Sequence, residues 1–502
     1  MTDQTTRLYQ AQQIKTIEQL AVPQYAVSEF ELMESAGLAA FHLLQHCWPD
    51  ARTLGVFCGK GNNGGDGYVV ARLAKQAGWK VMVCQVGEGT GEPVAAEKAR
   101  LACQAAGVEI KPFEHLWQQP FQADVIVDAL LGIGIKGEVK GSYATVIAAI
   151  NAAQKPVLSI DVPSGIDADT GRVCGVAVQA NVTLTFMALK RGLYTGAAPQ
   201  YCGDLHYDGL LPAIETLLDE VPASAVLLHL SALLQYLAPR KRDANKGNFG
   251  HVLIMGGNRG MVGAARMAGE AAARVGAGLV SLATWPEHAA YIAAARPELM
   301  CHGVTSPADC GALLARASVL VIGPGLGQDS WAQQLWTLGL SAAQLKILDA
   351  DALNLLAKNP CKRDDWILTP HPGEAARLLN CSVADIQADR FKAAAELAER
   401  YGGVIVLKGA GTLVQSSARV GVCALGNPGM ATGGMGDVLS GVLGGLVAQG
   451  LPLENAAQLG VVLHAEAGDK VAREQGERGM LALDLMRVLR MLVNEEGNSS
   501  PK

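Results

Sequence analysis

Short apolar runs alternate with helix-like segments along most of this chain of 502 residues. The runs in the first half are rich in Val, Ile and Leu: TLGVFCG, KVMVCQV, DVIVDALLG and PVLSIDVPSG. Between them, apolar residues recur at helical spacing, which predicts helices at about 29–46, 68–77 and 93–106. Strands that read as continuous apolar runs are typical of parallel sheets buried on both faces. We therefore predict an open, doubly wound α/β sheet.

The alternation lapses between residues 212 and 240, where the sequence is weakly periodic and then polar and basic. It restarts with HVLIMGG and continues through GLVSLAT, SVLVIGPGLG, LKILDADALNLL, WILTPHPGEAARLL and GVIVLKGAGTLV. A long helix from Asp437 follows. The lapse predicts a boundary near residue 225, so we expect two α/β domains, over 1–225 and 226–502.

Composition and charge restrict the class of protein. Half of the residues are apolar and 18% are charged, which favours a large core over disorder. The net charge of −6 argues against nucleic acid or an anionic membrane as a partner. The eleven cysteines include no C-x-x-C pair and the N-terminus has no apolar signal segment, so we expect a cytoplasmic protein with reduced thiols. The longest uncharged stretch, after Asp437, falls short of a membrane span and predicts a buried helix.

A glycine loop, GKGNNGGDG, follows the first predicted strand. It combines two glycines suited to positive φ and close ligand approach with three polar residues suited to ligand contacts: Gly64, Gly65, Asn62, Asn63 and Asp66. A carboxylate at a helix start competes with phosphate for the positive end of the helix dipole. Ribose hydroxyls or a cation therefore suit this loop as well as phosphate does. The alternative is an ordinary Asn/Gly turn with Asp66 as the helix N-cap.

Two further strands of the first domain end in carboxylates, Asp128 and Asp161, and Ser164 follows the second. The carboxyl ends of parallel strands open on the same side of a sheet, so these groups would converge with Asn63. Oxygen donors from Asn, Asp and Ser favour a hard cation over zinc. An aspartate that closes a buried strand is as often a loop cap, and this alternative stays open for each.

A second glycine motif, NPGMATGGMGDVLSG, lies in the other domain. Gly433, Gly434 and Gly436 expose amides just before a helix that begins near Asp437, which predicts a site for a transferring phosphoryl group. The Asp437 carboxylate stands where it could take a proton from a hydroxyl. Upstream, KGAGT (408–412) contains one cationic side chain, Lys408, and two glycines that make its backbone flexible. This combination suits contacts with the phosphates or ribose of a nucleotide. The alternative is that these glycines only form a tight turn that leads into the helix and bind no ligand.

Weaker signals lie at other strand ends of this domain. His371 stands between two prolines after a strand, a rigid setting that favours a binding role, although lone histidines are more often structural. GPGLG (323–327) gains weight only because it follows the apolar run SVLVI. Asp349 and Asp351 are either metal-facing groups or helix N-caps, and the sequence does not decide between the two.

Six motifs in order resemble those of known families. GNNGGDGYVVARLAK, VDALLGIGIKGE and IDVPSGIDADTG are similar to motifs of the NAD(P)H-hydrate epimerase (YjeF N-terminal) family, which implies a Rossmann-like fold. TPHPGEAARLL, VLKGAGT and GNPGMATGGMGDVLSG resemble the ADP-dependent NAD(P)H-hydrate dehydratases, which are ribokinase-like α/β sandwiches. Over nearly the whole chain, the two sets in this order resemble the bacterial bifunctional nicotinamide nucleotide repair family.

The resemblance implies two activities and the residues that serve them. The first domain would interconvert the R and S forms of hydrated NADH and NADPH, and the second would dehydrate the S form with ADP, giving NAD(P)H, AMP and phosphate. The hydrate in the first domain would contact Asn62, Asn63, Gly64, Gly65, Asp66, Gly132, Ile133, Gly134, Ile135, Lys136, Gly137, Glu138, Tyr143 and Asp161. A potassium ion would be held by Asn63, Asp128 and Ser164. In the second domain the hydrate would face Gly263, Ala264, Gly325, His371 and Asp437, and the nucleotide would contact Lys408, Gly409, Ala410, Gly411, Thr412 and Gly436.

We expect Asp437 to be the general base of the dehydratase and Asp161 to be the acid/base of the epimerase. ADP is the expected phosphoryl donor, with Mg²⁺ beside it. One departure concerns Ile133 and Ile135, which replace the threonine common in that loop of the family, so that one hydroxyl contact is lost.

Two rival functions share these features. A ribokinase-like kinase for a small molecule, such as a vitamin precursor, would use the same anion site and base, with the first domain as a nucleotide-binding module. Alternatively, the first domain is a non-catalytic sensing or protein-binding module. In either case we expect a homo-oligomer, with neither nucleic acid nor membrane as a partner.

Overall fold

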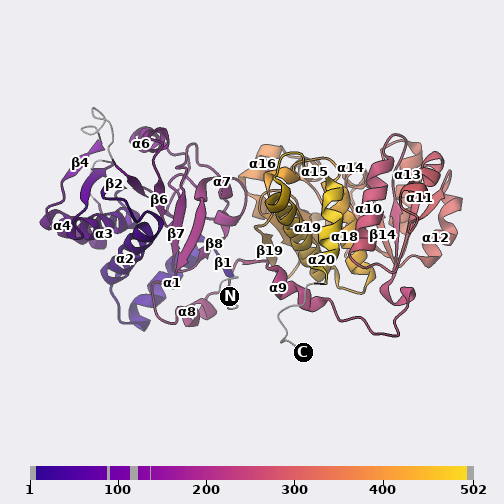
Figure 1. The fold of residues 1–502 in the computed structure, drawn as a ribbon, viewed down its shortest axis with the longest axis horizontal. Coiled ribbons are helices and arrows are strands. Elements are labelled where there is room, and N and C mark those ends of the chain that lie inside the picture. The colour runs from indigo at the N-terminus through magenta and orange to yellow at the C-terminus, as the bar shows by residue number, and fades with distance from the viewer. Residues whose placement is uncertain (1–6, 88–90, 114–122, 136, 495–502) are drawn as a thin grey trace. The chain divides into compact units, whose positions relative to one another are not determined.

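The computed structural model describes residues 7–87, 91–113, 123–135 and 137–494, whose fold is shown in Figure 1. The chain divides into two compact units, Met1–Ala225 and Val226–Lys502. Lys136, expected in the substrate loop of the first unit, lies outside the described residues. Both units are α/β, and the strands run mostly parallel.

The first unit contains a sheet of order β4-β3-β2-β5-β6-β7-β9 in which every neighbouring pair is parallel. Its strands are β2 (Thr53–Cys58), β3 (Lys80–Gln85), β4 (Ile110–Pro112), β5 (Val125–Ala129), β6 (Val157–Ile160), β7 (Val182–Phe186) and β9 (Asp204–Asp208). The strand order reverses between β2 and β5, and open α/β sheets bind ligands at such a point. The predicted doubly wound, Rossmann-like sheet is confirmed.

Successive side chains of a strand point to opposite faces of the sheet, and helices cover both faces. Val56 packs with α2 and α3 on one face, while the adjacent Phe57 packs with Val146 of α6 on the other. The described helices are α1 (Ala11–Gln24), α2 (Glu29–Cys47), α3 (Asn62–Gln76), α4 (Val94–Ala105), α6 (Gly141–Ala152), α7 (Pro199–Cys202) and α8 (Glu215–Glu220). A short parallel pair, β1 (Arg7–Tyr9) with β8 (Leu189–Lys190), lies outside the main sheet.

The first glycine motif differs from its prediction. Helix α3 begins at Asn62 rather than near residue 68, with Gly61 as its N-cap, so Asp66 lies inside the helix and does not cap it. Gly64 is helical and does not have a positive φ. A Cβ there would lie 1.9 Å from the carbonyl oxygen of Gly59. Gly64 and Gly65 therefore allow the first turn of α3 to pack closely against Gly59 and Met33. They do not form an open loop for a ligand.

The sheet of the second unit has the order β13-β12-β11-β14-β15-β16-β17-β18-β19-β10. Its strands are β10 (Ala225–Leu227), β11 (His251–Met255), β12 (Leu279–Thr284), β13 (Met300–Gly303), β14 (Val319–Ile322), β15 (Leu345–Leu348), β16 (Trp366–Leu368), β17 (Val404–Leu407), β18 (Thr412–Gln415) and β19 (Val420–Cys423). The strands β17, β18 and β19 pair antiparallel. The run 403–414 is thus a hairpin, and its reversal uses positive φ at Gly409 and Gly411.

Helices α10 and α18 pack closely in the second unit. A Cβ at Gly441 of α18 would lie 2.0 Å from the carbonyl oxygen of Ala268 in α10, so only glycine permits this approach. The helices of the unit are α9 (Leu230–Leu233), α10 (Val262–Arg274), α11 (Pro286–Ala295), α12 (Gly311–Arg316), α13 (Ser330–Ser341), α14 (Asp351–Lys358), α15 (Pro372–Leu379), α16 (Val383–Ala388), α17 (Arg390–Tyr401), α18 (Met435–Ala448), α19 (Leu453–Gln475) and α20 (Leu485–Leu492).

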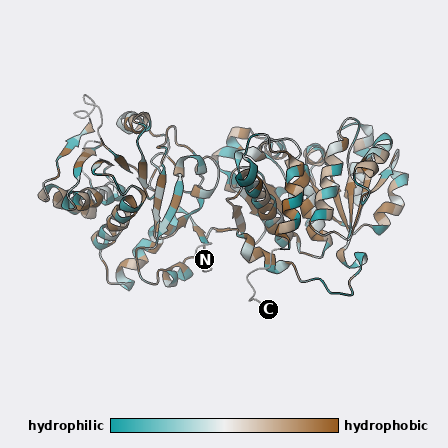
Figure 2. Ribbon diagram, in the orientation of Figure 1, coloured by the Kyte–Doolittle hydropathy of each residue, from teal (hydrophilic) through white to brown (hydrophobic). Residues whose placement is uncertain are grey.

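Hydrophobic residues gather in the strands and in α18, as Figure 2 shows. The uncharged stretch after Asp437 forms most of α18, which is buried along its length as predicted. Among the described residues, no helix is both long and apolar enough to cross a membrane. All eleven cysteines belong to the described part and are free thiols, in agreement with the prediction.

Candidate active sites

Three neighbouring strands of the second unit end in polar residues at one edge of the sheet. Asp349, Thr369 and Lys408 each follow the last residue of β15, β16 or β17. These strands are parallel neighbours, so the three side chains emerge at the same edge. The strand register therefore brings together residues that are far apart in the sequence.

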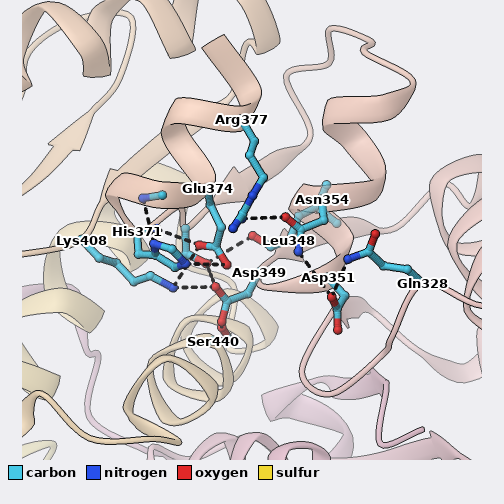
Figure 3. Close-up of polar contacts among 12 residues, drawn as sticks. Gln328, Leu348, Asp349, Asp351, Asn354, His371, Glu374, Arg377, Lys408 and Ser440 are labelled. Carbon is cyan, nitrogen blue, oxygen red and sulfur yellow. Dashed lines mark hydrogen bonds and ion pairs between the residues drawn. The ribbon is translucent and has the colours of Figure 1, made fainter. Parts of the chain in front are cut away.

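Lys408 and the buried Asp349 form a partly buried ion pair at this edge (Figure 3). The Lys408 ammonium donates to Asp349 at 2.7 Å and lies 3.8 Å from Glu374. The hydroxyls of Thr369 and Ser440 donate to Asp349 at 2.8 and 2.7 Å. Burial raises the pKa of Asp349, but Lys408 and these hydrogen bonds outweigh it and hold the pKa below its ordinary value. Burial lowers the pKa of Lys408, and the two carboxylates more than offset it, so a cation is fixed here.

Asp437 lies in the first turn of α18, beside this pair. Gly434 is the N-cap at φ +94°, a conformation that favours glycine. A Cβ at Gly436 would lie 3.3 Å from the Lys408 Nζ, so a side chain would fill the space between the helix start and the cation. Burial and then repulsion by Asp349 raise the pKa of Asp437 to about 7, against the attraction of Lys408. The first amides of a helix have no intrahelical partner and attract anions. The Asp437 carboxylate, which can accept a proton near neutral pH, therefore lies beside the anion-binding amides at the start of α18.

His371 is the N-cap of α15, and its ring is about half exposed. The backbone amide of Gly373 donates to His371 Nδ1 at 2.9 Å, and the His371 amide donates to Glu374 at 2.8 Å. Burial, then the charges of Lys408 and Arg377, lower the pKa of His371. Since Nδ1 accepts a hydrogen bond, the neutral ring carries its proton on Nε2, which can donate to a ligand.

The GPGLG loop after β14 lies against the start of α10. Gly325 has φ +60°, and a Cβ there would lie 2.8 Å from the Met261 Cβ and 3.0 Å from the Ala264 Cβ. A Cβ at Gly263, by contrast, would meet no atom of the described residues within 4 Å. The structure therefore brings Gly325, Gly263 and Ala264 together, as the resemblance implies.

The loop 408–412 is held by a residue that the sequence analysis missed. The guanidinium of Arg390, at the start of α17, is buried and donates to the carbonyl oxygens of Leu407 and Lys408. The hydroxyl of Thr412 donates to the carbonyl oxygen of Gly409 at 2.9 Å. No local motif marks Arg390, because it reaches this loop only through the fold.

The N-cap alternative for Asp349 and Asp351 is wrong, and the metal-facing alternative stays a prediction. The N-cap of α14 is Ala350, Asp349 holds Lys408, and Asp351 is the first helical residue. The Asp351 carboxylate accepts from Asn354 at 3.3 Å (Figure 3). It also accepts from the Gly327 amide at 2.8 Å, which joins the GPGLG loop to α14. Within the described ranges, no cluster of three or more His, Cys, Asp or Glu side chains is placed to hold a metal ion.

The first unit has a cavity of about 560 Å³ beside its strand-order reversal. It lies between helices α1 and α2, the start of α3, and the segments that follow β5 and β6. Its lining includes most of the residues expected to bind the hydrate: Asn62, Asn63, Asp66, Gly132, Ile133, Gly134, Ile135, Tyr143 and Asp161. Gly64, Gly65, Gly137 and Glu138 are not in that lining. Glu138 is exposed and pairs with Lys140 at 2.9 Å.

Oxygen atoms suited to a cation gather at the same place. Asp128 is fully buried and accepts from the Ser164 hydroxyl at 2.6 Å and from the Ser159 hydroxyl at 2.8 Å. Burial raises the pKa of Asp128, and the hydrogen bonds from Ser164 oppose it. Both polar side-chain atoms of Asn63 are buried without a partner among the described residues, and Gly132 lies against this side chain. A hard cation prefers oxygen ligands such as the orphaned Asn63 carbonyl oxygen and the buried Asp128 carboxylate.

Asp161 follows β6 at φ +66°, in the region that favours glycine. Its carboxylate is paired with the ammonium of Lys190 and accepts from the Phe186 amide at 3.3 Å. Lys190 is 1% exposed and also donates to the Phe186 carbonyl oxygen at 2.7 Å. Sequence reasoning missed Lys190 and also missed Glu18, which lines the cavity from α1.

The comparisons with known proteins agree with the order of the motifs. A family model described as YjeF-related protein N-terminus matches residues 29–192, and one described as NAD(P)H-hydrate dehydratase matches 252–490. A bifunctional NAD(P)H-hydrate repair enzyme, Nnr, of Coxiella burnetii is 54% identical over 97% of this chain and 100% of its own. The Nnr of Escherichia coli is 45% identical over 97% of this chain and 94% of its own.

A solved structure is similar to part of the chain. A ribokinase-like superfamily protein from Enterococcus faecalis is 31% identical with a TM-score of 0.50, covering 53% of this chain and 94% of its own. The predicted ribokinase-like fold of the second half is confirmed.

Proposed function

Because the chain belongs to the family of bifunctional NAD(P)H-hydrate repair enzymes, we propose that it restores hydrated NADH and NADPH to the working coenzymes. The first domain, 1–225, interconverts the R and S epimers. The second domain, 226–502, dehydrates the S epimer with ADP and releases NAD(P)H, AMP and phosphate. The observation that carries this proposal is Asp437, with its pKa near 7, at a bare helix start beside the Lys408–Asp349 pair.

The dehydration needs activation because hydroxide is a poor leaving group. Asp437 takes the proton of the ring hydroxyl, and the oxygen attacks the terminal phosphoryl group of ADP. The first-turn amides of α18 and the Lys408 ammonium stabilise the charge that develops on that group. Phosphate then leaves as the lone pair of the ring nitrogen forms a double bond to carbon. Loss of a proton from the neighbouring ring carbon returns the electron pair to nitrogen and gives NAD(P)H. AMP is the other product.

The remaining residues of the second domain hold the two substrates. Nε2–H of His371 donates to the hydrate, which lies over Gly325 and the start of α10 at Gly263 and Ala264. The nucleotide contacts the loop 408–412 and Gly436. Mg²⁺ finds no preformed cluster of protein ligands among the described residues, so the ADP phosphates and water would supply most of its ligands and it would offset their charge.

In the first domain, the hydrate occupies the cavity with Asp161 as the acid/base. Asn63, Asp128 and Ser164 hold a potassium ion, which would neutralise part of the charge on the substrate. The orphaned Asn63 carbonyl oxygen supports this assignment. The cytoplasmic location and the homo-oligomer stay predictions, and sedimentation of the purified protein tests the second.

The decisive experiment incubates the protein with a mixture of R and S hydrates and ADP, while the near-ultraviolet absorbance of the restored coenzyme is followed. Recovery of both epimers with stoichiometric AMP requires both activities. Recovery that stops when the S form is consumed removes the epimerase from the proposal. Consumption of ATP with a stable phosphorylated alcohol as product would instead establish the rival kinase.

A further inference from the structure

A partly buried carboxyl group in the cavity of the first domain has no role in the function proposed above. Glu18 lies in α1 and lines the cavity together with Asp66 and Asp161. It makes no hydrogen bond or ion pair with any residue that the structure describes. A partly buried carboxyl group that faces a cavity without a partner is a candidate for proton transfer.

The two carboxyl groups that matter here occupy opposite environments. Asp161 is paired with Lys190 and accepts from the Phe186 amide, which stabilises its carboxylate. Glu18 has no such partner, and burial followed by repulsion from Asp161 raises its pKa to about 7. Environments that separate two carboxyl groups in this way define an acid and a base.

The other charged groups around Glu18 do not remove this difference. Lys190 and Lys15 lower the pKa of Glu18, and Glu29 raises it, but burial is the largest cause. Asp66 is a further carboxyl group of the cavity. Burial, then the charges of Asp161 and Glu18, hold its pKa well above the ordinary value. The resemblance already assigns Asp66 to contact with the hydrate, so Glu18 is the partly buried carboxyl group of the cavity that has no role yet.

We propose that Glu18 and Asp161 form an acid–base pair that epimerises the hydrate by removing water from one face of the ring and adding it to the other. The proposal rests on the epimerase function proposed for this domain. Glu18 reaches the cavity from α1 and Asp161 from the end of β6, so the two groups come from different walls. An inversion at carbon requires this arrangement, because the departing and entering oxygens lie on opposite faces.

The step balances as follows. Glu18 gives its proton to the ring hydroxyl as the carbon–oxygen bond breaks and water leaves. The lone pair of the adjacent ring nitrogen forms a carbon–nitrogen double bond. A water molecule then adds to the opposite face, its proton passes to Asp161, and the electron pair returns to nitrogen. No oxidant, reductant or nucleotide is consumed.

After one inversion the protonation states of the two groups are exchanged, and this is the state that the reverse inversion needs. Exchange with water restores the first state. Lys190 holds the Asp161 side chain through their ion pair and acts as a positioning residue, which does not touch the substrate.

The test compares Glu18→Gln with Glu29→Gln, which removes a carboxylate from the exposed rim of the same cavity. Exchange between purified epimers is measured without ADP. Loss of an acid of this kind typically slows a reaction by about 10²-fold or more. We expect that loss for Glu18→Gln and near-normal exchange for Glu29→Gln. Dehydration of the S form by the second domain stays unchanged in both variants.

The pH profile separates catalysis from a structural role. In the native protein, the exchange rate in both directions should fall as the pH rises through about 7, because Glu18 loses its proton. The residual exchange of Glu18→Gln should lack this dependence. Normal exchange in Glu18→Gln, or an unaltered pH profile, overturns the proposal.

Heavy-oxygen water tests the chemistry in the native protein and needs no variant. Each inversion should place one labelled oxygen in the ring hydroxyl. Inversion without label overturns the removal and addition of water. If the native protein exchanges no epimers at all, the epimerase function itself fails, and that result is distinct from either outcome for Glu18.

Discussion

Replacing Asp437 by asparagine should remove dehydration while making the second unit more stable. Asn cannot take the proton of the ring hydroxyl, and the loss of a general base typically costs about 10²-fold in rate or more. The stability gain has a separate origin. The folded protein holds the pKa of Asp437 at about 7, whereas its ordinary value is 3.8, because the carboxylate is buried and faces Asp349.

The sign and size of this gain follow from proton linkage. A carboxyl group whose pKa is raised by folding binds its proton more tightly in the folded state, so ionisation destabilises the fold. The penalty is absent below about pH 4, grows between about pH 4 and 7, and is constant above. One pKa unit corresponds to about 1.4 kcal/mol. A rise of the Asp437 pKa from 3.8 to about 7 on folding therefore corresponds to about 4 kcal/mol of stability. Asn, which is uncharged, avoids this penalty.

Urea unfolding of the native protein and Asp437→Asn at several pH values measures the difference. At pH 8 the variant should have the higher free energy of unfolding for the second unit, by up to about 4 kcal/mol. At pH 4 the two proteins should be nearly equal. Ser330→Ala, a change in the first turn of α13, controls for non-specific effects and should show no such pH dependence. A variant that is less stable than the native protein at pH 8, or that still dehydrates the S form at the native rate, would refute the reasoning.

Three further predictions concern the other groups. Gly436→Ala should weaken ADP binding by about tenfold, because its methyl group would lie 3.3 Å from the Lys408 Nζ, and calorimetric titration with ADP measures the loss. Asp128→Asn should abolish any acceleration of epimer exchange by potassium, and a response to potassium chloride like that of the native protein would contradict the cation assignment. Lys190→Met leaves Asp161 without its cation and should lower the thermal stability of the first unit by about 3 kcal/mol, whereas unchanged unfolding would show that the pair contributes nothing.

The sequence alone predicted what depends on local patterns. Apolar runs show where a chain enters a buried parallel strand, so the sheets were expected. Gly436 and Asp437 are adjacent in one motif, and Lys408 directly follows an apolar run, so the main features of the second site were visible before the fold. The association of Lys408 with Asp349 and Thr369 also follows from one rule, because parallel neighbouring strands end at the same edge.

The remaining features depend on contacts that no local pattern contains. Gly64 was expected to have positive φ, but its absent side chain instead lets the start of α3 pass the Gly59 carbonyl oxygen. Arg390, Lys190 and Glu18 reach their sites from other elements of the fold. A buried lysine resembles a surface lysine in sequence, and only the packing around Lys190 shows that it pairs with a carboxylate.

The path of one oxygen atom tests the central claim most directly. S hydrate with heavy oxygen in its ring hydroxyl is dehydrated with ADP in an Asp161→Asn variant, so that the first unit does not exchange the label. If the hydroxyl attacks the phosphoryl group at the start of α18, the released phosphate should carry the label. Unlabelled phosphate, with the heavy oxygen found in water, would contradict phosphoryl transfer to the substrate.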